Sequence, residues 1–388
     1  MNAPATATIQ TVEEFRDSHL DVLPDEPDAI VTPQPYAIWT PSQFFSYEEP
    51  PEDRIILPAF LCHATITALI GPAGLGKSRL SVYLSICQII GKPWCGLEVC
   101  KTPKKWLLLG DENGPARLKN DLEHLALGLT KAESELVEQF LRLPVILGDG
   151  SDFNLGDPAN RARFVATVKE HSPDVVVIDP LQSFLPGDLS KPGDMSSGLQ
   201  LLIKATREAA PRAAILILHH ARPGTANITQ AVGYNAGNYG SGGKSLLAKS
   251  RAVFNLAPGK SDDDTRLVLA CGKASNCVKF ETRGIVLDTR TFNYQVDPEF
   301  DQEAWLEDVE TNGKGDGSAC TVFDVVELVR DGTIQTGDIK RKLIKLHGIS
   351  GPTAERLIRK TGDVKGIEPV VRGKWKLGAK AQRILNHQ

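Results

Sequence analysis

The residues best suited to chemistry form one short glycine-rich stretch, GPAGLGKS, at residues 71–78. It fits the pattern GxxxxGK[ST], follows the apolar run ITALI and leads into the helical sequence RLSVYLSICQII. Its glycines let backbone N–H groups turn inward around phosphate oxygens, and the start of a helix adds a favourable dipole. The sequence therefore predicts a phosphate-binding loop (P-loop) for ATP and Mg²⁺, with the Lys77 ammonium on the terminal phosphates and the Ser78 hydroxyl on the metal. The residues expected to bind the cofactor here are Gly71, Pro72, Ala73, Gly74, Leu75, Gly76, Lys77, Ser78 and Arg79.

A second stretch, GSGGKS at residues 240–245, resembles a P-loop only at first sight. The position that needs the first glycine is Asn238, and no strand-like run leads into it. We therefore expect no second nucleotide site there.

Polar residues at the ends of three apolar runs would complete the site. PDVVVIDP supplies Asp179, a candidate for organising Mg²⁺. KWLLLGDENG ends in Asp111 and Glu112; hydrolysis needs a carboxylate that polarises the attacking water, and we favour Glu112 for that role. ILILHH ends in His219 and His220, where a side chain could sense the terminal phosphate. For all of them the alternative is a solvated side chain at a strand end.

The elements that must position these residues are a series of β-like runs at 64–71, 105–112, 143–148, 173–180 and 213–220. Amphipathic segments such as PARLKNDLEHLALGL lie between them, which predicts a parallel sheet covered on both faces. After residue 243 come the shorter runs RAVFNLA, TRLVLACG, RGIVLD and TFNYQV, which predict an antiparallel extension of the same sheet. The expected fold class is α/β.

The order of these motifs resembles the RepA-type hexameric helicases of plasmids, which belong to the RecA/DnaB-like ring ATPases. The resemblance covers about residues 55–295 and rests on the P-loop, GDEN, VVVIDPLQSF, ILILHHARPG, GSGGKSLLAKSRAVFNL and LACGKAS. It implies a RecA-like core and a hexameric assembly. It also places the family's functional residues on Lys77, Ser78, Glu112, Asp179 and His220; where the family commonly has Glu-Asp, this chain has Glu112-Asn113.

The resemblance also implies roles for two further basic residues. It implies an arginine finger at Arg251, reaching the nucleotide of a neighbouring subunit, and a second cation acting in trans at Lys273. An arginine that stabilises transition-state charge raises the rate by orders of magnitude, so hydrolysis would depend on assembly. The alternative is an ordinary surface arginine.

Two long loops, at residues 185–198 and 221–243, follow catalytic strands and are rich in Gly, Pro and Asn. In ring ATPases loops at these places face the central channel and hold single-stranded nucleic acid. We expect Lys191, Arg222 and Lys244 to meet DNA phosphates, and Tyr234 or Tyr239 to stack on bases. Loops that order only with a ligand are the alternative.

The formal net charge of −4 hides a polarised chain. Residues 1–54 carry eleven acidic and two basic residues, a net charge of −9, whereas residues 320–388 carry fourteen basic and seven acidic residues, a net charge of +7. A basic end favours a nucleic-acid partner, with a well-solvated domain as the alternative.

The basic end has the pattern of a winged helix-turn-helix. Three helical stretches, FDVVELVRD, TGDIKRKLIKLHG and GPTAERLIRKTGD, precede two short strands in IEPVVRGKWKLG, and Ser350 is a plausible N-cap of the third helix. Arg356 and Arg359 would face duplex DNA from that helix, and Lys374 would meet the backbone from the wing. Winged helices also bind proteins, and RepA-type helicases need not carry one.

The predicted organisation is a weakly structured acidic arm (1–54), an ATPase core (55–300), a Gly-rich linker (301–319) and the winged helix (320–388). No signal pattern or long apolar run is present, so we expect a cytoplasmic protein without a membrane partner. Seven cysteines without a CxxC pair argue for reduced thiols, against a disulfide framework or zinc site.

The expected function is an ATP-dependent DNA translocase or helicase that moves on single-stranded DNA in replication of a plasmid, phage or mobile element. Two alternatives stay open: a regulatory or loader ATPase that binds DNA without processive unwinding, and an ATP-dependent scaffold in defence or signalling.

Overall fold

The computed structural model describes residues 38–144, 153–189, 191–222, 225–241, 244–260, 263–312, 322–330, 332, 334–347, 351–363, 367–371 and 374–378. The chain divides into two compact units, Met1–Glu49 and Pro50–Gln388. Within the described residues, none of the helices is both long and apolar enough to cross a lipid bilayer. None of the described cysteines forms a disulfide.

The described part of the first unit is short and exposes its aromatic residues. Helix α2 (Pro41–Phe45) begins after Thr40, whose hydroxyl and backbone form a capping box with Gln43. The Trp39 ring packs against Phe44 at a centroid distance of 5.2 Å, and both rings stay largely exposed. Residues 1–37 of the expected acidic arm lie outside the described residues.

The second unit is built on a nine-stranded sheet in the order β11-β10-β9-β8-β3-β7-β6-β4-β5. From β8 to β5 all neighbouring strands run parallel, and from β8 to β11 they run antiparallel. The strands are β3 (Ile66–Gly71), β4 (Trp106–Gly110), β5 (Leu141–Arg142), β6 (Val175–Asp179), β7 (Ala214–His220), β8 (Ala252–Lys260), β9 (Asp263–Ala274), β10 (Arg283–Leu287) and β11 (Tyr294–Asp297). A two-stranded sheet, β1 (Arg54–Ile56) and β2 (Leu61–Cys62), precedes them.

The mixed α/β fold with a mostly parallel sheet is therefore confirmed, with two local differences. β8 was expected to open the antiparallel extension, but it pairs parallel to β3, and the reversal comes at β9. The strand expected at 143–148 is not found in its described part: β5 ends at Arg142, residues 143 and 144 are not in a strand, and residues 145–152 lie outside the described residues. The apolar residues of that run could serve a strand or a loop, since so short a run has no readable period.

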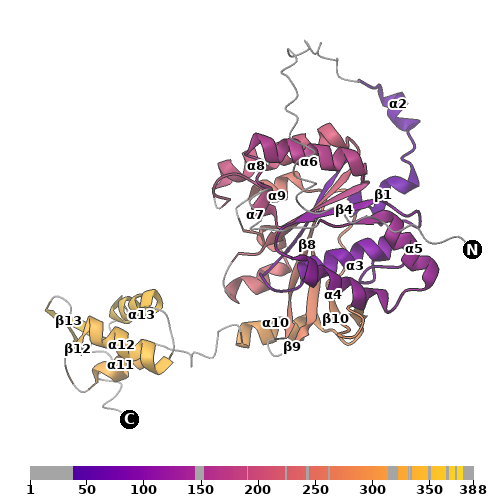
Figure 1. Ribbon diagram of the computed structural model, residues 1–388. Coiled ribbons are helices and arrows are strands. Elements are labelled where there is room, and N and C mark those ends of the chain that lie inside the picture. The colour runs from indigo at the N-terminus through magenta and orange to yellow at the C-terminus, as the bar shows by residue number, and fades with distance from the viewer. Residues whose placement is uncertain are drawn as a thin grey trace, which may run out of the picture. The chain divides into compact units, whose positions relative to one another are not determined.

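Helices cover both faces of the sheet (Figure 1). On one face α3 (Lys77–Ile89) packs among the core residues that include Leu69 and Leu108, and α4 (Pro115–Ala126) and α5 (Lys131–Phe140) lie on the same side. On the other face α6 (Pro158–His171) and α8 (Pro192–Ala209) pack over Ile70 and Ile217. Short helices α7 (Leu181–Phe184), η1 (Pro51–Asp53), η3 (Thr225–Ala231), η4 (Ala236–Asn238) and α9 (Lys244–Lys249) lie in the connections.

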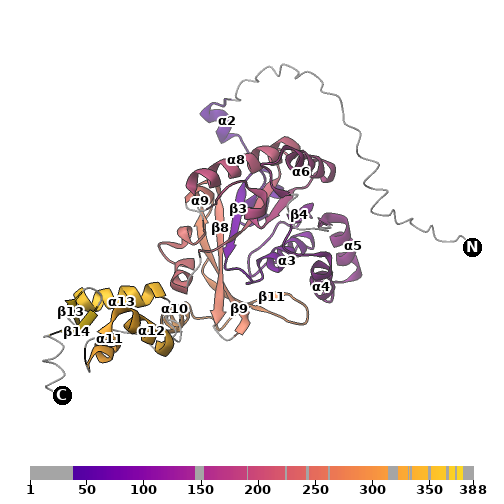
Figure 2. The ribbon, with the colours of Figure 1, turned by 60° about the vertical axis from the view of Figure 1, so that its left-hand side comes forward.

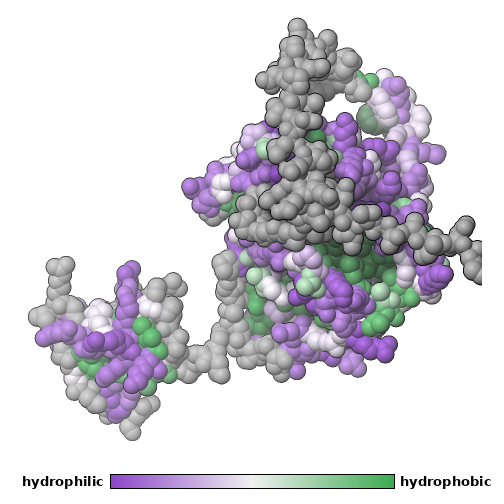
Figure 3. Space-filling model, in the orientation of Figure 1, coloured by the Kyte–Doolittle hydropathy of each residue, from purple (hydrophilic) through white to green (hydrophobic). Residues whose placement is uncertain are grey.

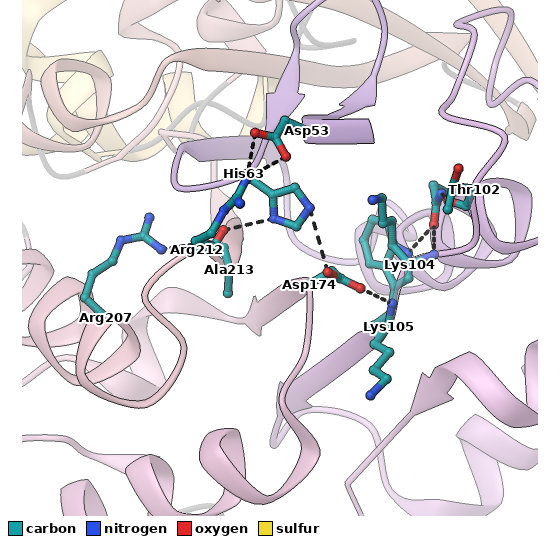
Figure 4. A network of polar contacts seen from close by, with 11 residues as sticks. Asp53, His63, Thr102, Lys104, Lys105, Asp174, Arg207, Arg212 and Ala213 are labelled. Carbon is teal, nitrogen blue, oxygen red and sulfur yellow. Dashed lines mark hydrogen bonds and ion pairs between the residues drawn. The ribbon is translucent and has the colours of Figure 1, made fainter. Parts of the chain in front are cut away.

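A polar network ties together the amino ends of the parallel strands (Figure 4). His63 Nδ1 donates to the Arg212 carbonyl at 3.0 Å, and His63 Nε2 lies 3.7 Å from the Asp174 carboxylate. The other oxygen of Asp174 accepts from the Lys105 backbone N–H at 2.8 Å. The Arg212 guanidinium holds Asp53 with both oxygens at 2.6 Å, so residues 50–54 belong to the core and not to the arm. This edge is opposite the P-loop, which follows the carboxyl end of β3.

The expected linker at 301–319 is wrong in its first half. Residues 302–312 form helix α10 (Gln302–Asn312), and Trp305 is buried in the core, where its indole N–H donates to the Pro258 carbonyl at 3.0 Å. The acidic composition of this segment indicated an exposed linker, but the one buried aromatic residue, Trp305, holds it on the core. Residues 313–321, the Gly-rich part, lie outside the described residues.

The last part of the second unit has its own small core. Helices α11 (Val322–Val329), α12 (Thr336–His347) and α13 (Gly351–Asp363) pack around Val325, Ile339 and Ile358. They are joined by a sheet in the order β12-β14-β13, made of β12 (Ile334–Gln335), β14 (Lys374–Leu377) and β13 (Ile367–Val371). The helices coincide with the expected stretches, while Ser350, the expected N-cap, lies outside the described residues. Figure 2 shows these elements from a second side. In the view of Figure 3, the described residues of this C-terminal part are mainly hydrophilic at the surface.

Candidate nucleotide site

The P-loop connects β3 to α3 in the conformation that its glycines permit. Gly74 has φ +75° and Gly76, the residue before the helix, has φ +81°, a left-handed conformation that other residues adopt at a cost. Gly71 has a different reason: a Cβ there would lie 2.8 Å from the Leu256 carbonyl oxygen of β8. The loop therefore needs glycine at each of these positions.

Lys77 is the centre of the polar contacts. Its buried ammonium donates to the carbonyls of Gly71 at 3.0 Å and Pro72 at 2.8 Å, and it lies 3.4 Å from His220 Nδ1. Burial lowers the pKa of Lys77, and the nearby carboxylates of Asp179 and Glu112 oppose that shift. The cation is thus held at the loop where phosphate oxygens would enter.

Asp179 ends β6 on the same edge of the sheet, with β7 inserted between β6 and β3. Its carboxylate is hydrogen-bonded to the Ser78 hydroxyl, and burial raises its pKa to about 6 against that bond. At this point β4 approaches β6 closely because Gly110 of β4 has no side chain; a Cβ there would lie 2.1 Å from the Asp179 carbonyl oxygen. A hydroxyl beside a carboxylate is a hard oxygen donor pair that suits Mg²⁺, which keeps most of its water ligands.

The two acids after β4 have different surroundings. Asp111 accepts a hydrogen bond from the Ser183 hydroxyl at 2.8 Å, and burial raises its pKa. Glu112 is more exposed, and its carboxylate lies 3.5 Å from His220 Nε2. Glu112 is therefore the acid that stands free of α7 and next to the Lys77–His220 pair.

The two histidines at the end of β7 point to opposite faces of the sheet, as successive residues of a strand must. His220 lies between Lys77 and Glu112, and burial together with the Lys77 charge lowers its pKa. His219 is buried on the other face; its Nε2 donates to the Ser241 carbonyl at 3.0 Å, and burial lowers its pKa to about 4. Only His220 reaches the candidate site.

Arg79 lies near the loop, but its side chain points elsewhere. The guanidinium contacts the buried Asp121 at 3.1 Å and lies 4.0 Å over the Phe292 ring. The Tyr294 hydroxyl lies 3.3 Å from where a Cβ on Gly76 would stand. We therefore propose Arg79 as a cofactor residue through its backbone only. No local spacing in the sequence relates Tyr294 to the P-loop, because the contact is tertiary: the Tyr83 hydroxyl of α3 donates to the Tyr294 carbonyl of β11 at 3.2 Å.

Arg251 and Lys273 lie at the end of the sheet where the parallel strands begin, opposite to the P-loop. Arg251 precedes β8, its N–H donates to the Ile66 carbonyl at the start of β3, and its side chain is exposed. Lys273 pairs with Val253 across β8 and β9, and its pKa is lowered by burial and by the charge of Arg251. The two cations are therefore neighbours, and β3 separates them from the P-loop by about 17 Å.

The described parts of the loops expected to hold DNA contain more helix than their composition indicates. Residues 192–198 belong to helix α8, so the first loop is shorter than expected, and Lys191 is the residue before that helix. Ser245 Oγ donates to the Pro192 carbonyl at 3.2 Å, which brings the neighbours of Lys191 and Lys244 together.

In the second loop, the exposed Arg222 uses its Nε to bond Gly240, and Tyr234 is fully exposed. Tyr239 is buried, and its hydroxyl donates to the Leu256 carbonyl at 3.2 Å, so of the two tyrosines offered as alternatives for stacking on bases only Tyr234 stays a candidate.

In the C-terminal part, Arg359 on α13 and Lys374 on β14 are exposed. Arg359 lines a pocket of about 530 Å³ together with Glu355 and Trp375. The backbone of Arg356 lies in α13, and its side chain lies outside the described residues.

The fold and these contacts define a P-loop protein of the class in which a further strand separates the P-loop strand from the strand that bears the second acid. Comparison with known families gives the same result: the model of the AAA domain family matches residues 33–226, half of the chain. The chain belongs to this family, and its nucleotide-binding core is that of a P-loop ATPase. No curated protein matches the chain with significance.

Proposed function

We propose that this protein hydrolyses ATP at sites shared between neighbouring subunits of a hexameric ring and uses the reaction to move along single-stranded DNA. The observation that carries the proposal is the position of Arg251 and Lys273. Both cations lie at the sheet edge opposite the P-loop of their own chain, beside each other, and Arg251 is exposed. Like charges kept together at an edge suit an anionic partner, and a neighbour's triphosphate is such a partner.

Within one chain, the proposed roles follow the contacts. Lys77 and the P-loop amides bind the phosphates, and Ser78 and Asp179 hold Mg²⁺, which supplies charge neutralisation when bound. Glu112 accepts the proton of the attacking water, since its carboxylate is exposed while Asp111 is held by Ser183. His220 lies between Glu112 and Lys77, so it is placed to respond to the terminal phosphate. We assign the supply of transition-state charge stabilisation to Arg251 of a neighbouring subunit.

The DNA would lie against Lys191, Arg222, Lys244 and the exposed ring of Tyr234. The contact between Ser245 and Pro192 supports a common surface for the two loops. We further propose that residues 322–378 are a winged helix, since helix, strand, two helices and two strands follow in that order. Its proposed DNA contacts are Arg356, Arg359 and Lys374.

That C-terminal part favours a second candidate, a DNA-binding regulatory or loader ATPase without processive unwinding. The two candidates differ in the nucleic acid that they need. The test is the ATPase rate with and without single-stranded DNA, run beside a mass measurement and a strand-displacement assay. The translocase predicts stimulation by single strands, a ring and displacement. Binding of duplex DNA without displacement favours the regulator, and no response to any DNA contradicts both.

A further inference from the structure

One row of residues across the sheet contacts residues 225–241, the segment that follows β7. Ile70 of β3 pairs in register with His219 of β7 on one side and with Asn255 of β8 on the other. We call His219, Ile70 and Asn255 the anchor row. It lies on the sheet face opposite α3, because Ile70 and its strand neighbours at every second position belong to the α6–α8 side of the core.

All three members of the anchor row contact residues 225–241. Asn255 is fully buried and uses both N–H groups of its amide, which donate to the carbonyls of Ala231 at 2.8 Å and Ala236 at 2.7 Å. His219 donates to the Ser241 carbonyl at 3.0 Å. Between them Gly240 rests on Ile70, so closely that a Cβ would lie 3.0 Å from the Ile70 methyl group.

The next row of the sheet belongs to the nucleotide site. Gly71 pairs with His220, one position after Ile70 and His219. The Gly71 carbonyl accepts from the Lys77 ammonium and from the Ala221 N–H, while the His220 carbonyl accepts from the Ser241 N–H. Ala221, which precedes the segment, and Ser241, its last residue, are therefore bonded to backbone carbonyls of this second row, and the Gly71 carbonyl also accepts from the Lys77 ammonium.

We propose that Asn255 and His219 are positioning residues that hold residues 225–241 as one body on the sheet, so that a change at the P-loop moves the exposed Tyr234. The inference rests on the proposed function only where it concerns DNA. Asn255 is buried away from the exposed surface, and the described hydrogen bonds of its side chain go to residues 225–241 and not to the P-loop. We therefore expect it to affect the coupling between the P-loop and residues 225–241, and not nucleotide binding itself. Its side chain makes no described contact with Lys77, Ser78 or Asp179.

Hydrogen exchange of the full-length protein, read by mass spectrometry with and without a non-hydrolysable ATP analogue and Mg²⁺, tests the proposal. In the wild type, the analogue should change exchange in both the P-loop and residues 231–241. In Asn255→Leu two buried carbonyls lose their donor, so exchange in 231–241 should become about tenfold faster or more. The P-loop should keep its response to the analogue while 231–241 loses it.

A matched control is Thr67→Val, which removes a buried hydrogen bond from β3 to the Phe60 carbonyl without touching the segment. It should leave exchange in 231–241 unchanged. Wild-type exchange in 231–241 of Asn255→Leu would overturn the proposal. So would equally accelerated exchange in β6, because the residue would then serve general stability only.

His219 gives a second, independent pair of variants if Asn255→Leu does not fold. His219→Gln keeps an N–H donor for Ser241 and should restore slow exchange, whereas His219→Leu should not; equal behaviour of the two contradicts the proposal. With single-stranded DNA, Asn255→Leu should lose the stimulated part of the ATPase rate and keep the DNA-free rate within about twofold. If the wild type does not respond to DNA, the proposed function fails, and the exchange data still decide on the anchor row.

Discussion

At the scale of single residues, the site depends on two pairs of adjacent polar residues whose members the strand pattern alone does not distinguish. Asp111 and Glu112 follow one strand, and His219 and His220 end another. Their types and their place at strand ends predicted polar groups near the P-loop. Which member of each pair faces Lys77 depends on the pleat of the strand and on partners such as Ser183, which lies far along the chain. Glu112 is favoured from the residues before any resemblance is considered, whereas His220 is separated from His219 only through the family resemblance.

The Glu112→Gln variant tests the role of the exposed acid. It should bind ATP with near-normal affinity and hydrolyse it at least about a hundredfold more slowly, because the amide cannot accept a proton from water. Equilibrium binding and steady-state turnover measure the two effects separately. Asp111→Asn keeps an oxygen for the Ser183 hydroxyl and serves as the matched control, with turnover within several-fold of wild type. Equal losses in the two variants would contradict the assignment.

The raised pKa of Asp179 predicts a pH dependence. Burial raises it to about 6, so the carboxyl is protonated below that pH and loses its charge for Mg²⁺. The Mg²⁺-dependent part of nucleotide affinity should fall by about tenfold for each pH unit below 6. Affinity in a chelator should not show this fall, and an Mg²⁺-dependent part that stays constant down to pH 5 would contradict the prediction.

The same carboxyl affects folding in the opposite direction to an acid in an ion pair. Because its pKa is higher in the folded than in the unfolded chain, it lowers stability above about pH 6, and this loss is relieved as the pH falls toward 4. Asp179→Asn should lack that component in metal-free thermal melts.

At the scale of elements, the apolar runs predicted the parallel strands well, because a strand buried on both faces is apolar throughout. Composition was a poorer guide to the connections. Residues 192–198 contain Pro, Gly and Asp yet begin α8, since Pro is well placed in the first turn of a helix. The acidic segment 302–312 is α10, held by Trp305. The two hydrogen bonds of Asn255, across 24 and 19 residues, have no local signature.

Trp305→Ala tests whether α10 belongs to the core. Losing a large buried side chain should lower the free energy of unfolding of the core by about 3–5 kcal/mol, because the cavity stays partly open. Chemical denaturation followed by circular dichroism measures the change. Trp39→Ala, at a residue that is 44% exposed outside the core unit, should change it by less than about 0.5 kcal/mol. A small effect at Trp305 would restore the segment to a linker.

At the scale of the whole molecule, the chain concentrates negative charge before the ATPase core and positive charge after it. The core carries few cations near its expected DNA surface, which is consistent with a ring in which each subunit holds only a few phosphates. On the proposed function, Arg251 and Lys273 act on the nucleotide of a neighbouring copy. Each chain would then supply one half of two different sites, and the complete catalytic unit would be the boundary between two copies.

Subunit mixing tests that central claim most directly. Lys77→Ala and Arg251→Ala should each abolish ATP hydrolysis alone, the first by loss of phosphate binding and the second with nucleotide binding intact. In randomly mixed rings, about a quarter of the boundaries join an intact P-loop to an intact arginine. Mixing the two inactive proteins should therefore restore hydrolysis toward that fraction of the wild-type rate. A mixture that stays inactive, or an Arg251→Ala protein that hydrolyses ATP at the wild-type rate, would contradict the claim.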